Sequence, residues 1–134
     1  MANESFVIWV SEKLAANRTL KGFPGKFAIK HNHIYRIDYY VAAEGLDDIG
    51  VACDFDELKK AIRRSLADLQ GSYLNDVADV IDCSPNEEGN PTAEVVARVV
   101  WRRAEAAIAE LDAGLKLQEV IIAESPSGKV VYRG

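Results

Sequence analysis

The stretch HNHIYRIDYYV, from His31 to Val41, decides how this chain folds. It is rich in β-branched and aromatic residues, which is typical of a β-strand. Side chains two residues apart on a strand point to the same face, so the only two histidines of the chain, His31 and His33, project together. A strand presents two imidazole nitrogens to one metal ion in this way. The remaining question is whether other residues complete such a site.

Four segments of the chain are predicted to be strands, because they are apolar or rich in β-branched residues. They are Phe6 to about Ala16, His31 to about Ala43, Leu117–Ala123 and Lys129–Tyr132. Residues 18–30 contain charged residues, glycines and a proline, which favours an exposed loop. Residues 45–48 and 125–128 are expected to form turns, and residues 49–53 a short extended stretch that ends at Cys53.

The first helix is predicted after Asp54, which together with Glu57 has the spacing of a capping box. Apolar residues then recur every three or four positions and give the helix one apolar stripe. The stripe consists of Phe55, Leu58, Ile62, Leu66 and Leu69. Gly71 is expected to end this helix.

A second helix is predicted after a loop at residues 80–89, with Asn90 as its cap and Pro91 as its first helical residue. Its buried face is expected to consist of Val96, Val99, Val100, Ala104, Ala107, Ile108 and Leu111. Gly114 is expected to close this helix.

The predicted order is β-β-α-α-β-β, which indicates one α+β domain over residues 1–134. A four-stranded antiparallel sheet with both helices on one face is the expected arrangement. Such a sheet leaves two open edges, which are liable to pair with other chains. Pairing between subunits into a barrel solves this problem, so we expect a ring-shaped homo-oligomer.

The composition excludes several classes of partner. The chain has 134 residues, 49% hydrophobic residues, a net charge of −5 and a pI near 5.0, which gives no electrostatic reason to bind nucleic acid or an anionic membrane. No apolar run approaches the roughly 20 residues that cross a bilayer, and no signal peptide is recognisable. Cys53 and Cys83 lack the spacing of a metal site, which favours reduced thiols in a cytoplasmic protein.

Several local patterns together resemble the family of 6-pyruvoyltetrahydropterin and 6-carboxytetrahydropterin synthases. The resemblance covers nearly the whole chain and is carried by the order and spacing of short motifs. The motifs are Ala15-Ala16-Asn17-Arg18, His31-Asn32-His33-Ile34-Tyr35, Gly50 to Lys59, Tyr73-Leu74-Asn75-Asp76, Asn90-Pro91-Thr92-Ala93-Glu94 and Val120 to Ser125.

This resemblance implies the tunnelling fold (T-fold), in which subunits form a barrel with active sites at their interfaces. It favours a hexamer of two stacked trimers. It also implies zinc held by three histidines, a cysteine base, an Asp-His pair for proton transfer and a glutamate that holds the pterin ring.

The chain keeps two of the three zinc-binding histidines of this pattern, His31 and His33, but departs from it at the third histidine, the base and the proton relay. Asn17 replaces the first zinc-binding histidine, and Phe27 stands at the position of the cysteine. Gln70 and Gly71 replace the Asp-His pair. Zinc favours imidazole and thiolate ligands, so His31 and His33 with one amide are expected to hold it weakly. We therefore expect no bound cofactor and no synthase reaction, which needs a Lewis acid and proton-transfer groups.

The pterin-binding positions are kept. Glu124 matches the glutamate of the family, and a carboxylate can accept two parallel hydrogen bonds from a 2-amino-4-oxo pyrimidine ring. Thr92 could offer its hydroxyl to the same ring, although helix capping explains this residue equally well. Glu124 could likewise be an ordinary strand glutamate.

Three functions follow from these residues. The leading hypothesis is a protein that binds a pterin-like or purine-like ring without synthase activity. The second is a metal-independent enzyme of the aldolase or lyase type, with Lys30 and Tyr35, or His31 and His33, as candidates for proton transfer. The third is a structural protein whose pocket has no ligand.

Overall fold

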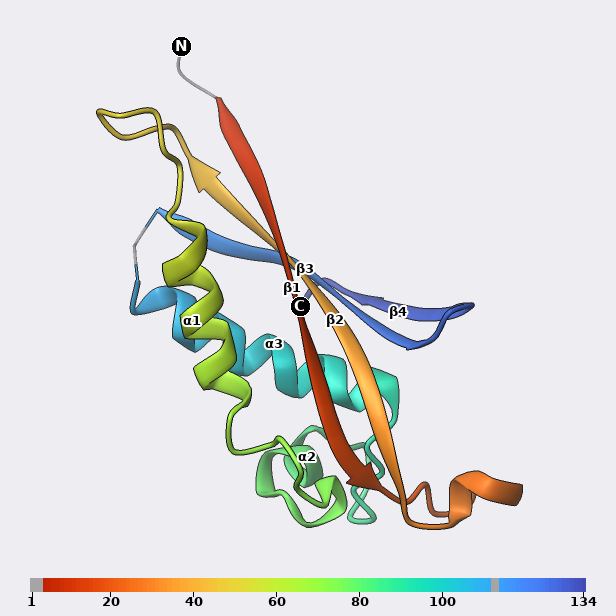
Figure 1. Ribbon diagram of the computed structural model, residues 1–134. Coiled ribbons are helices and arrows are strands. Elements are labelled where there is room, and N and C mark those ends of the chain that lie inside the picture. The colour runs from red at the N-terminus through yellow and green to blue at the C-terminus, as the bar shows by residue number, and fades with distance from the viewer. Residues whose placement is uncertain (1–3, 112–113) are drawn as a thin grey trace.

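The computed structural model describes residues 4–111 and 114–134 and contains one antiparallel sheet in the order β1-β2-β3-β4. The strands are β1 (Ser5–Arg18), β2 (His31–Glu44), β3 (Leu115–Ser125) and β4 (Gly128–Tyr132). In Figure 1, β1 and β2 form a long twisted hairpin, whereas β4 is much shorter. The four predicted strands are therefore confirmed, each slightly longer than expected.

The side chains on one face of the sheet form part of the hydrophobic core. Side chains alternate between the two faces of a strand, and on β1 and β2 alternate residues are buried. The register places Leu14 opposite Tyr35 and Ala16 opposite His33, so all four side chains belong to this face. Asn17 pairs with Asn32 and therefore belongs to the opposite face.

Three helices cover the core face (Figure 1): α1 (Phe55–Leu66), α2 (Ala78–Cys83) and α3 (Ala93–Ala109). α1 begins at Asp54, whose Oδ1 accepts hydrogen bonds from the backbone N–H groups of Asp56 and Glu57. The two predicted helices and the antiparallel α+β order are thus confirmed. None of the helices in the described part of the chain is long and apolar enough to cross a membrane.

The segment between the two predicted helices differs from the prediction. Residues 80–89 were expected to form a loop, but residues 78–83 form the short helix α2, because Val80 and Cys83 are buried in the core. Thr92, not Asn90, caps α3, and its Oγ1 accepts a hydrogen bond of 3.2 Å from the N–H of Val95. Asn90 instead makes two hydrogen bonds to the backbone of Lys21.

The region around α1 contains three further corrections. Phe55 was assigned to the apolar stripe but is 57% exposed, because it stands at the first position of the helix. α1 ends at Leu66, and Gly71 lies in a following turn with φ of +75°. Residues 49–53 form no strand, since Asp47 Oδ1 accepts hydrogen bonds from the N–H groups of Ile49 and Val51 and folds this segment into a loop.

Candidate functional site

The ends of three strands bring one polar cluster together on the core face. Arg18, the last residue of β1, lies directly opposite His31, the first residue of β2. His33 and Tyr35 follow at alternate positions, and Glu124 lies near the end of β3, where the pairing register with β4 shifts. Such irregularities change the direction of a side chain. We call Arg18, His31, His33, Tyr35 and Glu124 the strand-end cluster.

Arg18 is the centre of this cluster. Its side chain is 1% exposed and makes a bidentate ion pair with Glu124, with Nη1–Oε1 and Nη2–Oε2 distances of 2.6 and 2.9 Å. Nη1 also lies 2.9 Å from Tyr35 Oη and 3.3 Å from the Pro91 carbonyl, and Nε donates to His31 Nε2 at 3.3 Å. A buried charge needs such partners, so the cluster is held together by one guanidinium.

Tyr35 connects the cluster to the start of α3. Its hydroxyl donates to the Pro91 carbonyl at 2.7 Å and accepts from Arg18. The side chain is fully buried, and burial raises the pKa of its phenol well above the ordinary value. Because the phenol stays protonated and has no access to a ligand, Tyr35 holds Arg18 in position and is no candidate for proton transfer.

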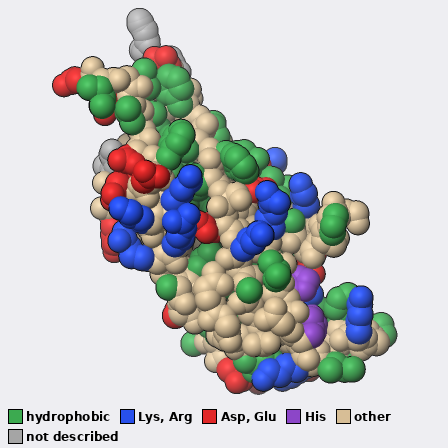
Figure 2. All heavy atoms as spheres, viewed as in Figure 1, with side chains coloured by type: hydrophobic (Ala, Val, Ile, Leu, Met, Phe, Trp, Pro, Cys, Tyr) green, Lys and Arg blue, Asp and Glu red, His purple; other side chains and the backbone are tan. Residues whose placement is uncertain are grey.

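The two imidazoles lie side by side with ring centroids 5.9 Å apart, and Figure 2 shows them together at the surface. His31 Nδ1 lies 2.8 Å from the Ile29 carbonyl, which requires the proton on Nδ1 and leaves Nε2 to accept from Arg18. His33 Nε2 lies 3.1 Å from Glu124 Oε2 but is not aligned for a hydrogen bond. Burial and the charge of Arg18 lower the pKa of His33, against the opposing effect of Glu124, and favour its neutral form.

A cavity of about 660 Å³ opens next to the strand-end cluster. Glu124 and Thr92 both line it, although they are 32 positions apart in the sequence, and so does Phe27. The Phe27 ring stands edge-on to His31, with centroids 6.2 Å apart, and to Phe23, with centroids 6.3 Å apart. The structure thus brings both predicted ring-binding residues to one cavity with an aromatic wall.

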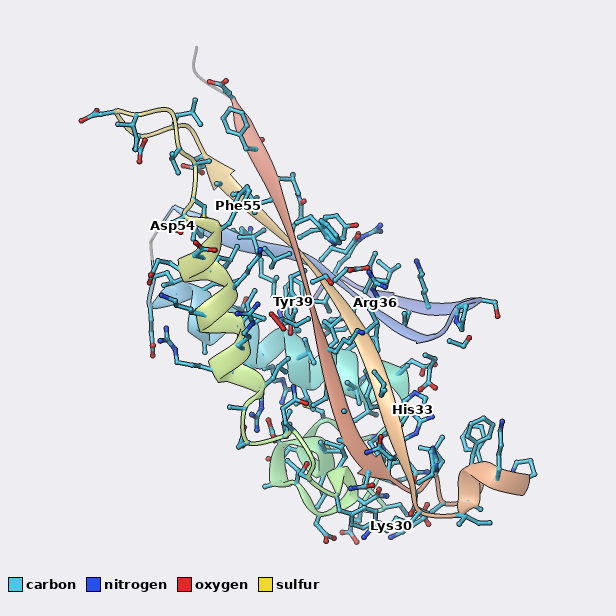
Figure 3. All side chains as sticks on the ribbon, viewed as in Figure 1. Lys30, His33, Arg36, Tyr39, Asp54 and Phe55 are labelled. Atoms are coloured by element: carbon cyan, nitrogen blue, oxygen red, sulfur yellow. The ribbon has the colours of Figure 1, made fainter. Side chains whose placement is uncertain are left out.

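Lys30 does not join this group. Its Nζ lies 4.8 Å above the ring of Tyr73, and it is not among the described residues that line the cavity. Figure 3 shows Lys30 beyond His33 at the lower end of the hairpin. The pair of Lys30 and Tyr35 that the sequence suggested for proton transfer is therefore not brought together.

Comparison with known proteins agrees with this architecture. The family model described as 6-pyruvoyl tetrahydropterin synthase matches residues 7–134. A curated relative, 6-carboxy-5,6,7,8-tetrahydropterin synthase from Bacillus subtilis (strain 168), is 30% identical over 103 residues, which are 77% of this chain and 67% of the relative. The chain belongs to the 6-pyruvoyl tetrahydropterin synthase family.

Several solved structures share the fold of this chain. The 6-pyruvoyl tetrahydropterin synthase of Caenorhabditis elegans matches with a TM-score of 0.79 at 18% identity, covering 100% of this chain and 99% of that one. The enzyme from Plasmodium vivax matches with a TM-score of 0.70 at 17% identity, covering 98% and 99%. An uncharacterized protein from Wolinella succinogenes matches with a TM-score of 0.72 at 13% identity over the same shares. The predicted T-fold of the single chain is thereby confirmed.

The zinc ion that the family resemblance implies does not fit the residues of this chain. Asn17 belongs to the face opposite His31 and His33, and its Nδ2 lies 3.4 Å from the Gly71 carbonyl. Arg18 uses the Nε2 lone pair of His31 that a metal would need, and its positive charge repels a second cation. Within residues 4–111 and 114–134, no group of three or more His, Cys, Asp or Glu side chains is arranged to hold a metal.

Gln70 and Gly71, which stand where the family resemblance implies the Asp-His pair, form hydrogen bonds with the backbone of β1. Gln70 Oε1 accepts from the N–H of Ala15 at 3.0 Å, and Gln70 Nε2 donates to the Lys13 carbonyl at 2.8 Å. The N–H of Gly71 donates to the Ala15 carbonyl at 2.8 Å. Gln70 and Gly71 thus pair with the outer edge of β1 and provide no group that could transfer a proton to a ligand.

Arg18 is the residue of the strand-end cluster to which the sequence analysis gave no role. It was quoted as part of the motif Ala15-Ala16-Asn17-Arg18 but was given no role. One signal was available: on β1 the buried positions alternate through Leu14 and Ala16, and Arg18 is the next in that series. A charged residue at a buried position of a strand indicates a partner of opposite charge.

Proposed function

We propose that this chain is a non-synthase member of its family that binds a flat 2-amino-4-oxo pyrimidine ring, as in a pterin, in the cavity beside Glu124. The observation that carries the proposal is the shared location of Glu124 and Thr92 in a cavity of about 660 Å³. This volume lies within the range of small-molecule sites. The names of the family and of the relatives described above support the class of ligand.

The contacts available in the cavity suit such a ring. Glu124 is 29% exposed, and a carboxylate has about four lone-pair sites, of which Arg18 uses two. A ring N–H or amino group can use a remaining site. The Thr92 hydroxyl accepts from Val95 and still has its own proton to donate to the ring oxygen. Phe23 and Phe27 offer apolar area on which a flat ring can pack.

The chemistry of a synthase is not supported by the side chains present. Phe27 carries no acid or base, Gln70 and Gly71 do not titrate, and Arg18 Nε donates to His31 Nε2. Arg18 also makes the bidentate pair with Glu124 that the sequence suggested for the ring. We therefore infer a ring held by fewer hydrogen bonds than a free carboxylate would allow, with no metal-assisted reaction.

Calorimetric titration of pterin into the wild-type protein and into Glu124→Gln tests the proposal. Lumazine, which has an oxygen in place of the 2-amino group, is the matched control ligand. We expect pterin to bind at least tenfold more tightly than lumazine to the wild type, and Glu124→Gln to lose this preference, since one carboxylate oxygen becomes a donor. Absence of pterin binding by the wild type would contradict the proposal and favour a purely structural role.

Assembly into a ring of subunits is part of the proposal. β1 and β4 are the two edges of the sheet, and exposed strand edges tend to pair with other chains. Trp9 and Val7 on β1 are about half exposed, which favours coverage by another subunit. We infer that the protein forms a homohexamer in the cytoplasm, with the cavity near a subunit interface. A particle mass in solution equal to that of a single 14.7 kDa chain would contradict the homohexamer.

A further inference from the structure

We propose that the ligand of the cavity beside Glu124 is larger than a bare ring, and that it carries an apolar substituent ending in a carboxylate, which Arg98 binds. This inference rests on the ring site proposed above and names the class of ligand that the site takes. That class is a pterin-like ring with a long acidic substituent. The cavity then has two polar ends, one at Glu124 and Thr92 and one at Arg98.

The cavity has room for more than a ring. Its volume of about 660 Å³ is typical of sites that enclose drug-sized ligands, whereas a pterin is a single small bicyclic ring. A pterin held by Glu124 and Thr92 therefore leaves part of the cavity free. The residues that line this remaining part decide which substituent can fill it.

The two polar ends are separated along α3. Glu124 lies near the start of α3, because Arg18 binds both the Glu124 carboxylate and the Pro91 carbonyl. Arg98 lines the same cavity and follows Thr92 by six residues, which is about 9 Å along a helix axis. An acidic group that reaches Arg98 is therefore joined to the ring by a linker.

The cavity wall available to this linker is apolar. Ala93 and Val95, which lie between Thr92 and Arg98 in the sequence, line the cavity, as do Leu20, Phe27 and Val130. A chain of phosphates would lose its hydration against these side chains without gaining hydrogen bonds in return. An aromatic or aliphatic linker is instead stabilised by the apolar surface that it buries. The lining thus favours an apolar linker over a phosphate chain.

Arg98 has the donors to bind a carboxylate. Its Nη1 donates to the Cys83 carbonyl at 2.8 Å, which fixes the guanidinium at the end of α2, and a guanidinium has five N–H donors in all. Lys129 and Glu94 also line the cavity and are exposed. Two positive charges against one negative charge favour an anion at this end, and a guanidinium matches a carboxylate in geometry.

Calorimetric titration of pteroic acid tests the inference, with its methyl ester as the matched control ligand that lacks the charge. We expect the wild type to bind pteroic acid at least tenfold more tightly than the ester or 6-methylpterin. Arg98→Gln should lose the preference for the acid over the ester. Glu94→Gln should enlarge this preference, because it removes a charge that repels the carboxylate.

Arg102→Gln is the control for the loss of one positive charge. Arg102 is exposed on α3 and is not among the described residues that line the cavity, so this variant should keep the preference of the wild type for the acid.

Three results would overturn the inference and leave the ring site in place. The first is binding of pteroic acid no tighter than that of 6-methylpterin. The second is a preference for the acid that persists in Arg98→Gln. The third is equally tight binding of 6-carboxypterin, whose carboxylate is attached directly to the ring and needs no linker. Absence of binding by every one of these ligands would instead contradict the ring site itself, and this inference with it.

Discussion

At the scale of single residues, two buried tyrosines on β2 differ in whether their hydroxyl groups have hydrogen-bond partners. Tyr35 and Tyr39 are both fully buried on the same face of the same strand. The Tyr35 hydroxyl donates to the Pro91 carbonyl and accepts from Arg18, whereas the Tyr39 hydroxyl has no hydrogen-bond partner among the described residues. A buried polar group stabilises the protein only when it is paired.

Removing these two hydroxyl groups should therefore change the free energy of unfolding differently. We expect Tyr35→Phe to lower the free energy of unfolding by about 1–3 kcal/mol, because Arg18 loses a buried acceptor. Tyr39→Phe is the matched control and should leave the free energy unchanged or raise it. Urea unfolding followed by circular dichroism measures both variants, and equal losses in the two would show that the Tyr35 hydrogen bonds do not stabilise the cluster.

At this scale the sequence predicted which side chains share a face of a strand, but not which residues they contact. The spacing of His31 and His33 predicted that they share a face of β2, and they do. Glu124, predicted to hold the ring, lines the cavity. The bidentate pair between Arg18 and Glu124 joins residues 106 positions apart. No local pattern reports such a contact, because it depends on the order of strands in the sheet and on the register shift at Glu124.

At the scale of secondary-structure elements, Arg103 joins α3 to its two neighbours. Its Nε and Nη2 donate to Asp79 at the start of α2, and Nη1 donates to Asp68 and to the Ser65 carbonyl near the end of α1. We expect Arg103→Met to lower the free energy of unfolding by about 1–2 kcal/mol, a modest value because Asp68 is largely exposed. The adjacent and exposed Arg102 is the control. Arg102→Met should change the free energy of unfolding by less than about 0.5 kcal/mol.

The effect of Arg103→Met should also depend on pH. Arg103 lowers the pKa of Asp68 through their hydrogen bond. A carboxyl group whose pKa is lowered by folding contributes stability above its unfolded pKa of about 3.9, and this contribution is lost as pH falls through the folded pKa. The difference between wild type and Arg103→Met should shrink below about pH 4 in chemical unfolding. A difference that stays constant from pH 7 to pH 3 would contradict this role of Asp68.

Secondary-structure elements were predicted most reliably where the periodic pattern of apolar residues extends over many positions. The strands and the two long helices follow from alternation and from three- and four-residue spacing. α2 has six residues, too few for a periodic signal, and it exists because Val80 and Cys83 are buried. The cap of α3 was misplaced because Asn90 and Thr92 are both good capping residues. Their hydrogen bonds distinguish them, since Thr92 accepts from Val95 whereas Asn90 pairs with the backbone of Lys21.

At the scale of the whole molecule, the chain has the fold of the synthase family, and we propose that it lacks the reactive groups of a synthase. The sheet and α3 still form a cavity in which Glu124 and Thr92 meet. Phe27 and Arg18 line this cavity, and the family resemblance implies a cysteine base at the position of Phe27. Gln70 and Gly71, where the resemblance implies the Asp-His pair, form hydrogen bonds with the backbone of β1. A family fold therefore indicates the place of the site, whereas its chemistry has to be argued from the side chains present.

The most direct test of this account is turnover of dihydroneopterin triphosphate by the wild-type protein after incubation with zinc. An active synthase assayed under the same conditions is the positive control. We predict no 6-pyruvoyl- or 6-carboxytetrahydropterin above the level without protein, because Lewis acid, base and proton relay are all lacking in the arrangement of Arg18, Phe27, Gln70 and Gly71. Zinc-dependent formation of either product would contradict the account.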